Sequence, residues 1–208
     1  RDRSPSRGLG DVYKRQEIHC DLTKPGTEYI PFASVDDTCR DISVTCIAPT
    51  KTFNLAGLQT AAVYAENSIL HHRMWRQLNT DEVAEPNAFA IQATIAAFQY
   101  GEEWLDELRE YVEKNKQYVT EFLQEKIPLI HPVAGDATYL MWLDCRKITE
   151  SGRQFAKFIR KTSGLYVSGG NQYGKGGEGF LRVNVATSKL VVEDGMQRLY
   201  ESVDAWLK

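Results

Sequence analysis

The stretch IAPTKTFNLAG, residues 47–57, decides how the rest of the chain is interpreted. An apolar, strand-like run ends at Pro49, a helix begins near the same point, and Lys51 stands at the junction. Most lysines lie on solvated surfaces, because burying an ammonium group without a partner is costly. Lys51 is therefore either a surface charge in a turn or a nucleophile held at the end of a strand.

The neighbours of Lys51 favour the nucleophile. No aspartate or glutamate occurs within nine positions before it or eight positions after it. A lysine that is buried without an acidic partner is more readily neutral, as an amine that attacks a carbonyl group must be. Thr50 adds a hydroxyl group suited to a phosphate or a phenolic oxygen. A solvated lysine in a turn remains the common alternative at such a position.

The composition excludes several classes of protein. The 208 residues are 42% hydrophobic and 25% charged, as in an ordinary globular protein, and the net charge of −3 does not suggest nucleic-acid binding. No apolar run approaches the roughly 18 residues of a membrane span. The cysteines show no CxxC spacing, so we expect reduced thiols in a cytoplasmic protein and no metal site. They are Cys20, Cys39, Cys46 and Cys145.

Strands and helices alternate along the chain, which predicts an α/β fold. Strands are expected at residues 17–23, 41–48, 57–67, 137–144, 165–170 and 179–186. Helices are expected at residues 68–78, 85–101, 102–126, 150–164 and 188–208. The strongest helical period covers residues 102–126, a helix long enough to link two lobes. In the strand GFLRVNVA, Leu181 and Val183 share one face, and Arg182 lies on the other.

The first sixteen residues, RDRSPSRGLGDVYKRQ, differ from the rest. They are basic and polar, without an apolar period, and they lack the apolar centre of a signal peptide. Their end resembles the translated sequencing-adaptor tails found on proteins from assembled metagenomic reads. We therefore set residues 1–16 aside from the fold as a non-native tail.

Four motifs in order resemble one family. APTKTFNLAGLQTA is similar to the cofactor-lysine signature of the aminotransferase class I/II superfamily, the fold-type-I pyridoxal-phosphate enzymes. KTFNLAG is most similar to its cystathionine β-lyase (C–S lyase) branch. EIHCDL, GDATYLMWLD and GFLRVNVA resemble further segments of that branch, so the resemblance covers residues 17–208.

This resemblance implies the C-terminal half of such an enzyme. Residues 17–125 would form the C-terminal part of the large domain, with part of its mixed sheet and the long helix. Residues 126–208 would form a small α+β C-terminal domain.

The resemblance also implies roles for five residues. Lys51 matches the lysine that forms the internal aldimine with pyridoxal 5'-phosphate and shuttles the substrate's Cα proton. Arg182 matches the arginine that clamps the substrate α-carboxylate, which a guanidinium group can bind through two parallel hydrogen bonds. Thr50 matches a hydroxyl residue near the cofactor's phosphate or ring oxygen. His19 matches a position next to the phenolic oxygen, and Ile18 matches the residue against the pyridine ring. A structural histidine is an equally common reading of His19.

Two positions depart from the family pattern. Gln59 stands where the aminotransferases carry an arginine for the cofactor phosphate, in keeping with the lyase branch. Gln16 stands where the family has an aspartate that hydrogen-bonds the pyridinium nitrogen.

We therefore expect a carbon–sulfur β-lyase that releases a thiol, pyruvate and ammonia from cystathionine or another S-substituted cysteine. The resemblance implies a cytoplasmic homodimer, without nucleic-acid or membrane partners. An aminotransferase using the same lysine and arginine is one alternative. A non-catalytic dimerisation or binding module is another, if the chain is complete as written. The 208-residue chain alone is expected to be inactive.

Overall fold

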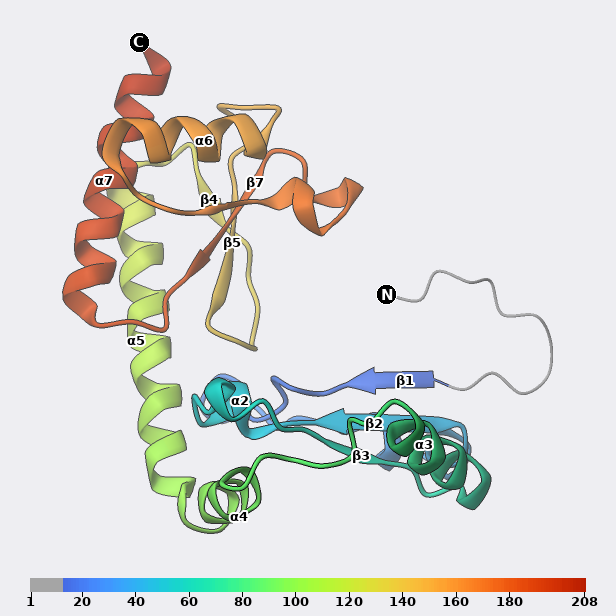
Figure 1. Ribbon diagram of the computed structural model, residues 1–208. Coiled ribbons are helices and arrows are strands. Elements are labelled where there is room, and N and C mark those ends of the chain that lie inside the picture. Colours follow the sequence, from blue (N-terminus) through green and yellow to red (C-terminus); the bar gives the residue numbers. More distant parts are fainter. Residues whose placement is uncertain (1–12) are drawn as a thin grey trace. The chain divides into compact units, whose positions relative to one another are not determined.

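The computed structural model describes residues 13–208, so most of the sixteen-residue tail lies outside the described residues (Figure 1). Contacts within the chain divide it into two compact units between Asp106 and Glu107. The first unit ends at Asp106 and the second begins at Glu107, and each is described separately. The domain boundary expected after residue 125 stays a prediction.

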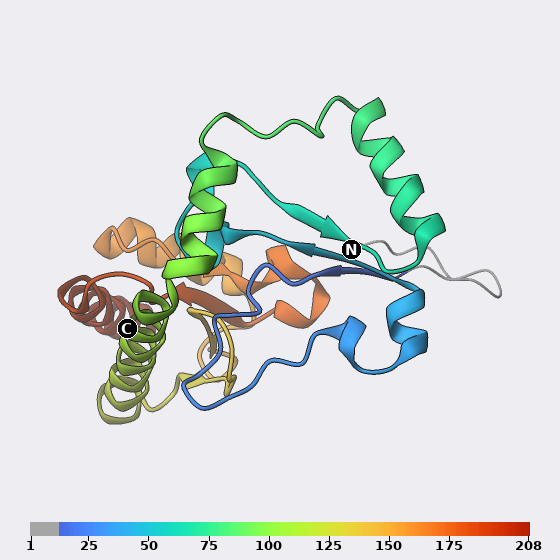
Figure 2. The same ribbon diagram turned by 90° about the horizontal axis from the view of Figure 1, so that it is seen from below.

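A three-stranded mixed sheet forms the centre of the first unit. Its strands are β1 (Tyr13–Gln16), β2 (Ser43–Ile47) and β3 (Ala62–Tyr64), in the order β1-β2-β3. β1 runs parallel to β2, whereas β3 runs antiparallel to it. The three strands lie side by side in Figure 2. The predictions of strands within residues 41–48 and 57–67 are confirmed.

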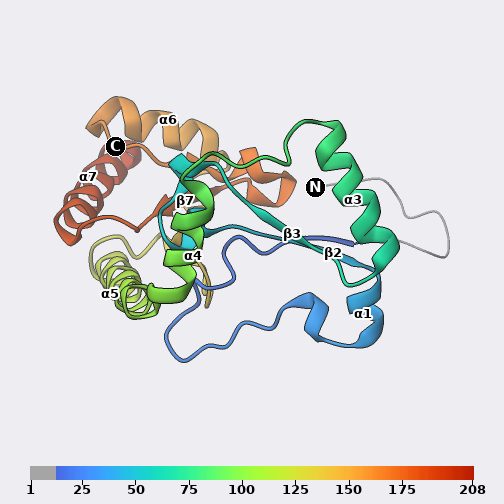
Figure 3. The same cartoon turned by 60° about the horizontal axis from the view of Figure 1, so that its bottom comes forward.

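Short helical turns and three longer helices surround this sheet. They are η1 (Phe32–Ser34), α1 (Asp37–Asp41), α2 (Pro49–Thr52), η2 (Ala56–Leu58), α3 (Ser68–Thr80), α4 (Ala90–Tyr100) and the start of α5 (Glu102–Lys126). Asn67 caps α3, because its side chain accepts hydrogen bonds from the amides of Ile69 and Leu70. Figures 2 and 3 place α1 on the β1 side of the sheet, and the connection between α3 and α4 on the β3 side.

The predicted strand at residues 17–23 is wrong. Residues 18–21 form a turn, in which the amide of Leu22 donates to the carbonyl oxygen of His19 at 3.0 Å. The alternation of Ile18, Cys20 and Leu22 imitates a strand pattern. The strand is β1 instead, the end of the tail that was set aside. β1 pairs with β2 through backbone groups, which require no apolar side-chain period.

The second unit combines the rest of α5 with a four-stranded antiparallel sheet. The strands are β4 (His131–Pro132), β5 (Leu140–Asp144), β6 (Ser168–Gly169) and β7 (Phe180–Asn184), in the order β4-β5-β7-β6. Its other elements are α6 (Gly152–Ser163), η3 (Gly170–Tyr173), η4 (Lys175–Gly177) and α7 (Lys189–Leu207). The predicted helix at residues 102–126 matches α5 at both ends.

The core of the second unit lies between its sheet and helices α5, α6 and α7. Leu181 and Val183 are buried in it, whereas Arg182 between them is only half-buried, so the expected faces of this strand are confirmed. The fully buried side chains include Val119, Leu123, Leu143, Phe155, Ile159, Leu181 and Leu199. Gly164 ends α6 in the left-handed conformation, with φ of 75°.

The first unit buries fewer large apolar side chains. Its buried hydrophobic residues are Leu22, Val44, Ala48, Ala65 and Ala90. Helix α4 leaves Ile91, Ile95 and Phe98 about half exposed, at a spacing that places them on one face. The two units therefore differ in how completely their apolar faces are covered.

Asn115 provides a test of the second unit. Its side chain is 2% exposed, and Nδ2 donates to the carbonyl oxygens of Val185 at 2.9 Å and Thr187 at 3.0 Å. Asn115→Ala leaves a buried carbonyl group without its donor, so we expect a loss of about 1–3 kcal/mol in the free energy of unfolding. Urea denaturation of the variant and the parent chain measures this difference in the free energy of unfolding. Gln117→Ala, an exposed change on the same helix, is the control. Equal midpoints for the two variants would contradict a stabilising role for Asn115.

Candidate active site

Lys51 lies in α2, a single helical turn that follows β2 directly. Pro49 occupies the first position of this turn, where a missing amide hydrogen costs nothing, and it is buried. Phe53 ends the turn, and Asn54 takes a left-handed conformation with φ of 54°. The backbone therefore holds Lys51 just beyond the carboxyl end of β2, where the sequence placed it.

The surroundings of Lys51 agree with its sequence neighbourhood. Its side chain is half-buried, and no carboxylate of residues 13–208 forms an ion pair with it. Several other basic residues do form such pairs, for example Arg146 with Asp144 and Arg198 with Asp194. The Lys51 amine is therefore available to an incoming group.

A hydrogen bond fixes the turn that carries Lys51. Thr52 is fully buried, and its Oγ1 donates to Oδ2 of Asp21 at 2.9 Å. This bond joins the lysine turn to residues 18–21, the turn that carries Ile18 and His19. No local sequence pattern predicts this bond, because its hydroxyl group and carboxylate lie 31 positions apart in the chain.

The two turns meet because β1 and β2 are parallel. Gln16 lies opposite Cys46 in the sheet, and the amide of Glu17 donates to the carbonyl oxygen of Cys46 at 2.9 Å. The segments that follow therefore leave the sheet at the same edge. Open α/β sheets bind ligands outside the carboxyl ends of their parallel strands. Ile18, His19, Thr50 and Lys51 follow these ends, and all four are half-buried.

Cys20 shares this turn but is not suited to act as a nucleophile. Burial, followed by the nearby charge of Asp21, raises the pKa of its thiol to about 12. A thiol with such a pKa is protonated at neutral pH and does not attack substrates. Lys51 is therefore the better candidate for covalent chemistry at this edge of the sheet.

Aromatic contacts hold the backbone on the other side of Lys51. The ring of Phe53 meets the edge of Phe98 at 5.2 Å and lies 6.1 Å from the ring of Trp104, measured between centroids. Gly101 passes so close that an added Cβ would approach the Phe53 ring to 2.6 Å. The turn is thus fixed from both of its ends, by Asp21 and by α4.

Arg182 lies in the second unit, on β7. It stands between Trp142 on β5 and Ser168 on β6 in the register of the sheet. Its guanidinium carbon lies 4.1 Å from the centroid of the Tyr173 ring. No carboxylate of residues 13–208 forms an ion pair with it. Its charge is therefore available to an anion.

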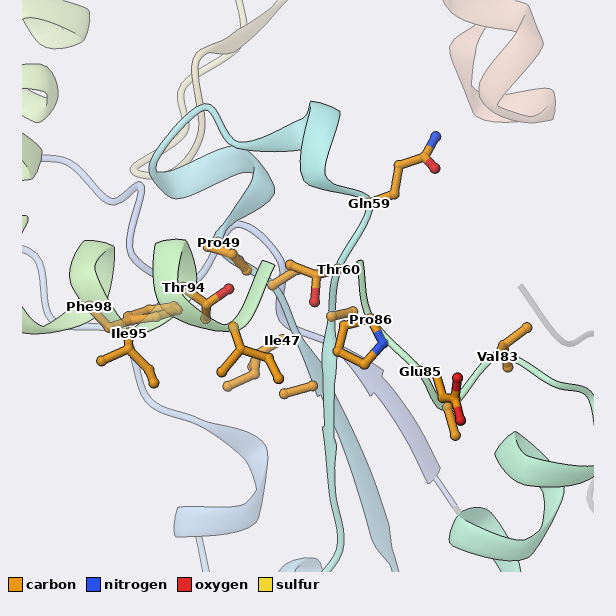
Figure 4. A pocket seen from close by; sticks show the side chains of 15 residues that line it. Ile47, Pro49, Gln59, Thr60, Val83, Glu85, Pro86, Thr94, Ile95 and Phe98 are labelled. Carbon is orange, nitrogen blue, oxygen red and sulfur yellow. The ribbon is translucent and has the colours of Figure 1, made fainter. Parts of the chain in front are cut away.

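A cavity of about 440 Å³ lies beside α4 in the first unit (Figure 4). Ile95 and Phe98 from α4 face Ile47 and Thr60 across it, and Gln59 points away from these residues. Lys51 is not among its lining residues, but Pro49, the first residue of the lysine turn, is. Gln59 lies at its border with φ of 48° and is exposed.

Two kinds of site are absent from residues 13–208. No group of three or more histidine, cysteine, aspartate or glutamate side chains there could hold a metal ion. Among these residues, too, no helix is both apolar enough and long enough to cross a lipid bilayer.

Comparisons with known proteins agree with this picture. The family model for aminotransferase class I and II matches residues 17–199. Cystathionine beta-lyase PatB of Bacillus subtilis is 39% identical over 183 residues, which are 88% of this chain and 47% of that protein.

Two solved structures share the fold. Cystalysin from Treponema denticola, which contains a pyridoxal 5'-phosphate cofactor, has a TM-score of 0.90 at 27% identity, over 95% of this chain and 50% of that one. The PLP-bound C-S lyase from Staphylococcus hominis has a TM-score of 0.81 at 31% identity, over 92% of this chain and 50% of that one. These matches confirm the expected fold class. The chain spans about half the length of the relatives it matches.

Proposed function

We infer that this chain, which belongs to the aminotransferase class I and II family, carries the lysine and the carboxylate-binding arginine of a PLP-dependent carbon–sulfur β-lyase. The proposed reaction converts cystathionine, or another S-substituted cysteine, into a thiol, pyruvate and ammonia. The observation that carries it is the half-buried Lys51, without an ion-pair partner in residues 13–208, where the parallel strands end. The 39% sequence identity to the cystathionine beta-lyase of Bacillus subtilis supports this substrate class.

The residues at this edge of the sheet fit pyridoxal 5'-phosphate. Lys51 offers an amine for its aldehyde carbon, Thr50 a hydroxyl group for an oxygen of the phosphate or the ring, and Ile18 an apolar surface for the ring. His19 lies in the turn that Asp21 joins to the lysine turn. When bound, the cofactor withdraws the electron pair left at the substrate Cα when its proton is removed.

Lys51 is proposed to move that proton. Its Nζ, as a free amine, accepts the proton from Cα, and the electron pair of the broken C–H bond forms the Cα–Cβ double bond. The thiolate leaves Cβ with the electrons of the C–S bond and takes up a proton. The remaining 2-aminoacrylate reacts with water to give pyruvate and ammonia. The Thr52–Asp21 bond supports this role, because it limits the movement of the backbone from which Nζ reaches the substrate.

Arg182 is proposed to bind the substrate α-carboxylate. Two parallel hydrogen bonds from its guanidinium group would fix both the position and the angle of the carboxylate. A carboxylate held at two points is fixed in position and angle relative to the guanidinium group, and the substrate Cα attached to it is fixed with it. The absence of an acidic partner for Arg182 among residues 13–208 supports this role.

The proposal extends to a cytoplasmic homodimer, as the family resemblance implies. The exposed apolar side chains of α4, at Ile91, Ile95 and Phe98, support a buried position for this helix in the assembled protein.

The substitution Arg182→Lys tests the carboxylate site. We define the joined protein as residues 17–208 preceded by the part of the Bacillus subtilis lyase that this chain does not match. In the joined protein, Arg182→Lys should raise KM for cystathionine about tenfold, because a point charge replaces a two-pronged donor. Affinity for pyridoxal phosphate should stay within about twofold, measured by its absorbance. Arg160→Lys, an exposed change on α6, is the control. An unchanged KM would show that another group holds the carboxylate.

A further inference from the structure

The Tyr173 ring lies against the guanidinium group of Arg182. Their separation of 4.1 Å, from guanidinium carbon to ring centroid, is well inside the range of roughly 6 Å for cation–π contacts. Arginine stacks on aromatic rings through the flat face of its guanidinium group. The N–H donors lie in the guanidinium plane and point away from its face, so they stay available to a carboxylate.

Tyr173 is itself held in place by an aromatic neighbour. Its ring makes an edge contact with Trp142, with centroids 5.4 Å apart and planes at 76°. Trp142 lies directly opposite Arg182 in the β5–β7 register, so the tryptophan contacts the tyrosine from a position beside the arginine. Arg182, Tyr173 and Trp142 thus form one packed group outside the core of the second unit.

Close-packed glycines shape the loop that presents Tyr173. An added Cβ at Gly170 would approach the carbonyl oxygen of Gly177 to 2.4 Å, and one at Gly177 would approach that of Gly170 to 2.1 Å. Gly174, which follows Tyr173, has φ of 125°, which side-chain-bearing residues rarely adopt. The backbone at Gly170 and the backbone at Gly177, on either side of Tyr173 in the chain, are therefore in close contact.

We propose that Tyr173 is a positioning residue that presets the guanidinium plane of Arg182 for the substrate carboxylate. The inference rests on the proposed role of Arg182. An unrestrained arginine side chain samples many rotamers, and a stacked one has lost much of that freedom before the carboxylate arrives. Tyr173 improves affinity without touching the substrate, and its ring rather than its hydroxyl group does so.

The test is a nuclear magnetic resonance experiment on the 208-residue chain with acetate as the probe. The Nε–Hε signal of Arg182 should be shifted upfield by the Tyr173 ring. Tyr173→Phe should keep that shift and change the acetate dissociation constant by less than twofold. Tyr173→Leu should abolish the shift and weaken acetate binding about fivefold. Tyr166→Leu removes a different stacked pair of this unit, in which the guanidinium carbon of Arg160 lies 5.1 Å from the Tyr166 ring, and it should leave Arg182 unaffected.

The outcomes separate the inference from the proposed function. Equal acetate affinity in Tyr173→Leu and the parent chain would overturn the positioning role and leave the carboxylate role of Arg182 intact. An Arg182 signal that acetate fails to move in the parent chain would overturn both. If Tyr173→Leu disturbs the amide signals of the glycine loop, Trp142→Leu replaces it. That variant keeps Tyr173 but removes its edge contact, and acetate binding should weaken about twofold. Unchanged binding there would also count against the inference.

Discussion

Replacing Lys51 with alanine is expected to stop pyruvate release by the joined protein. A positioned general base contributes roughly 10²–10⁴-fold to a rate, and Lys51 is also proposed to bond to the cofactor, so the loss should be about 10³-fold or more. The visible absorption band of the lysine-bound cofactor should disappear in the same variant. Pyruvate release and absorbance spectra on the purified protein measure both.

Two further variants show whether the loss of activity in Lys51→Ala comes from the loss of the amine. Lys51→Arg keeps a positive charge in the turn but offers no amine that can bond to the cofactor, so it should be as inactive as the alanine variant. Lys157→Ala, an exposed change on α6, should keep the parent rate. Normal activity in Lys51→Arg would mean that the lysine serves only as a charge, and the assignment would fail.

The second large effect concerns the chain by itself. The 208-residue chain should release pyruvate from cystathionine no faster than free pyridoxal phosphate does, whereas the joined protein should turn over. The chain spans about half the length of the relatives it matches. The resemblance also places an aspartate for the ring nitrogen where this chain has Gln16. The cofactor would therefore lack an acidic partner for its ring nitrogen, and Lys51, Thr50 and Ile18 would hold it only loosely.

The measurement is pyruvate release by both proteins at equal concentration, with the retained cofactor determined after gel filtration. Comparable turnover would show that residues 1–208 form a sufficient catalyst, and the expected dependence on the other half would be wrong. Release of a keto acid that retains the sulfur substituent, with the amino group transferred to the cofactor, would instead support the aminotransferase alternative.

The sequence predicted the helices and strands in which apolar side chains recur at regular spacing. The ends of α5 were predicted correctly, because its apolar residues recur at helical spacing and Gly101 precedes it. The start of a helix close to Lys51 was also predicted, from the proline after an apolar strand, and α2 begins at that proline, Pro49. Strand β1 was missed, because backbone pairing with β2 requires no particular side chains and its residues are polar.

Residues of the candidate site could be predicted only where they belong to a sequence motif of the family. The family resemblance supplied Lys51 and Arg182. The contacts that hold them join residues far apart in the chain, such as Thr52 with Asp21, and no local pattern reports them. Likewise, the glycines of residues 169–179 predicted a loop, but not that this loop would place Tyr173 on Arg182.

The unequal cores of the two units have a consequence for hydrogen exchange. Amides of β5, β7 and α7 surround a continuous apolar cluster, so they should exchange only when the second unit opens as a whole. Within residues 13–208, β1 and β3 each pair only with β2, and few large side chains are buried near them. Their amides should exchange through small local openings. Along the continuous helix α5, amide protection from exchange should therefore rise from low before Glu107 to high after it. All the buried residues of α5 follow Glu107. They are Val112, Asn115, Val119 and Leu123.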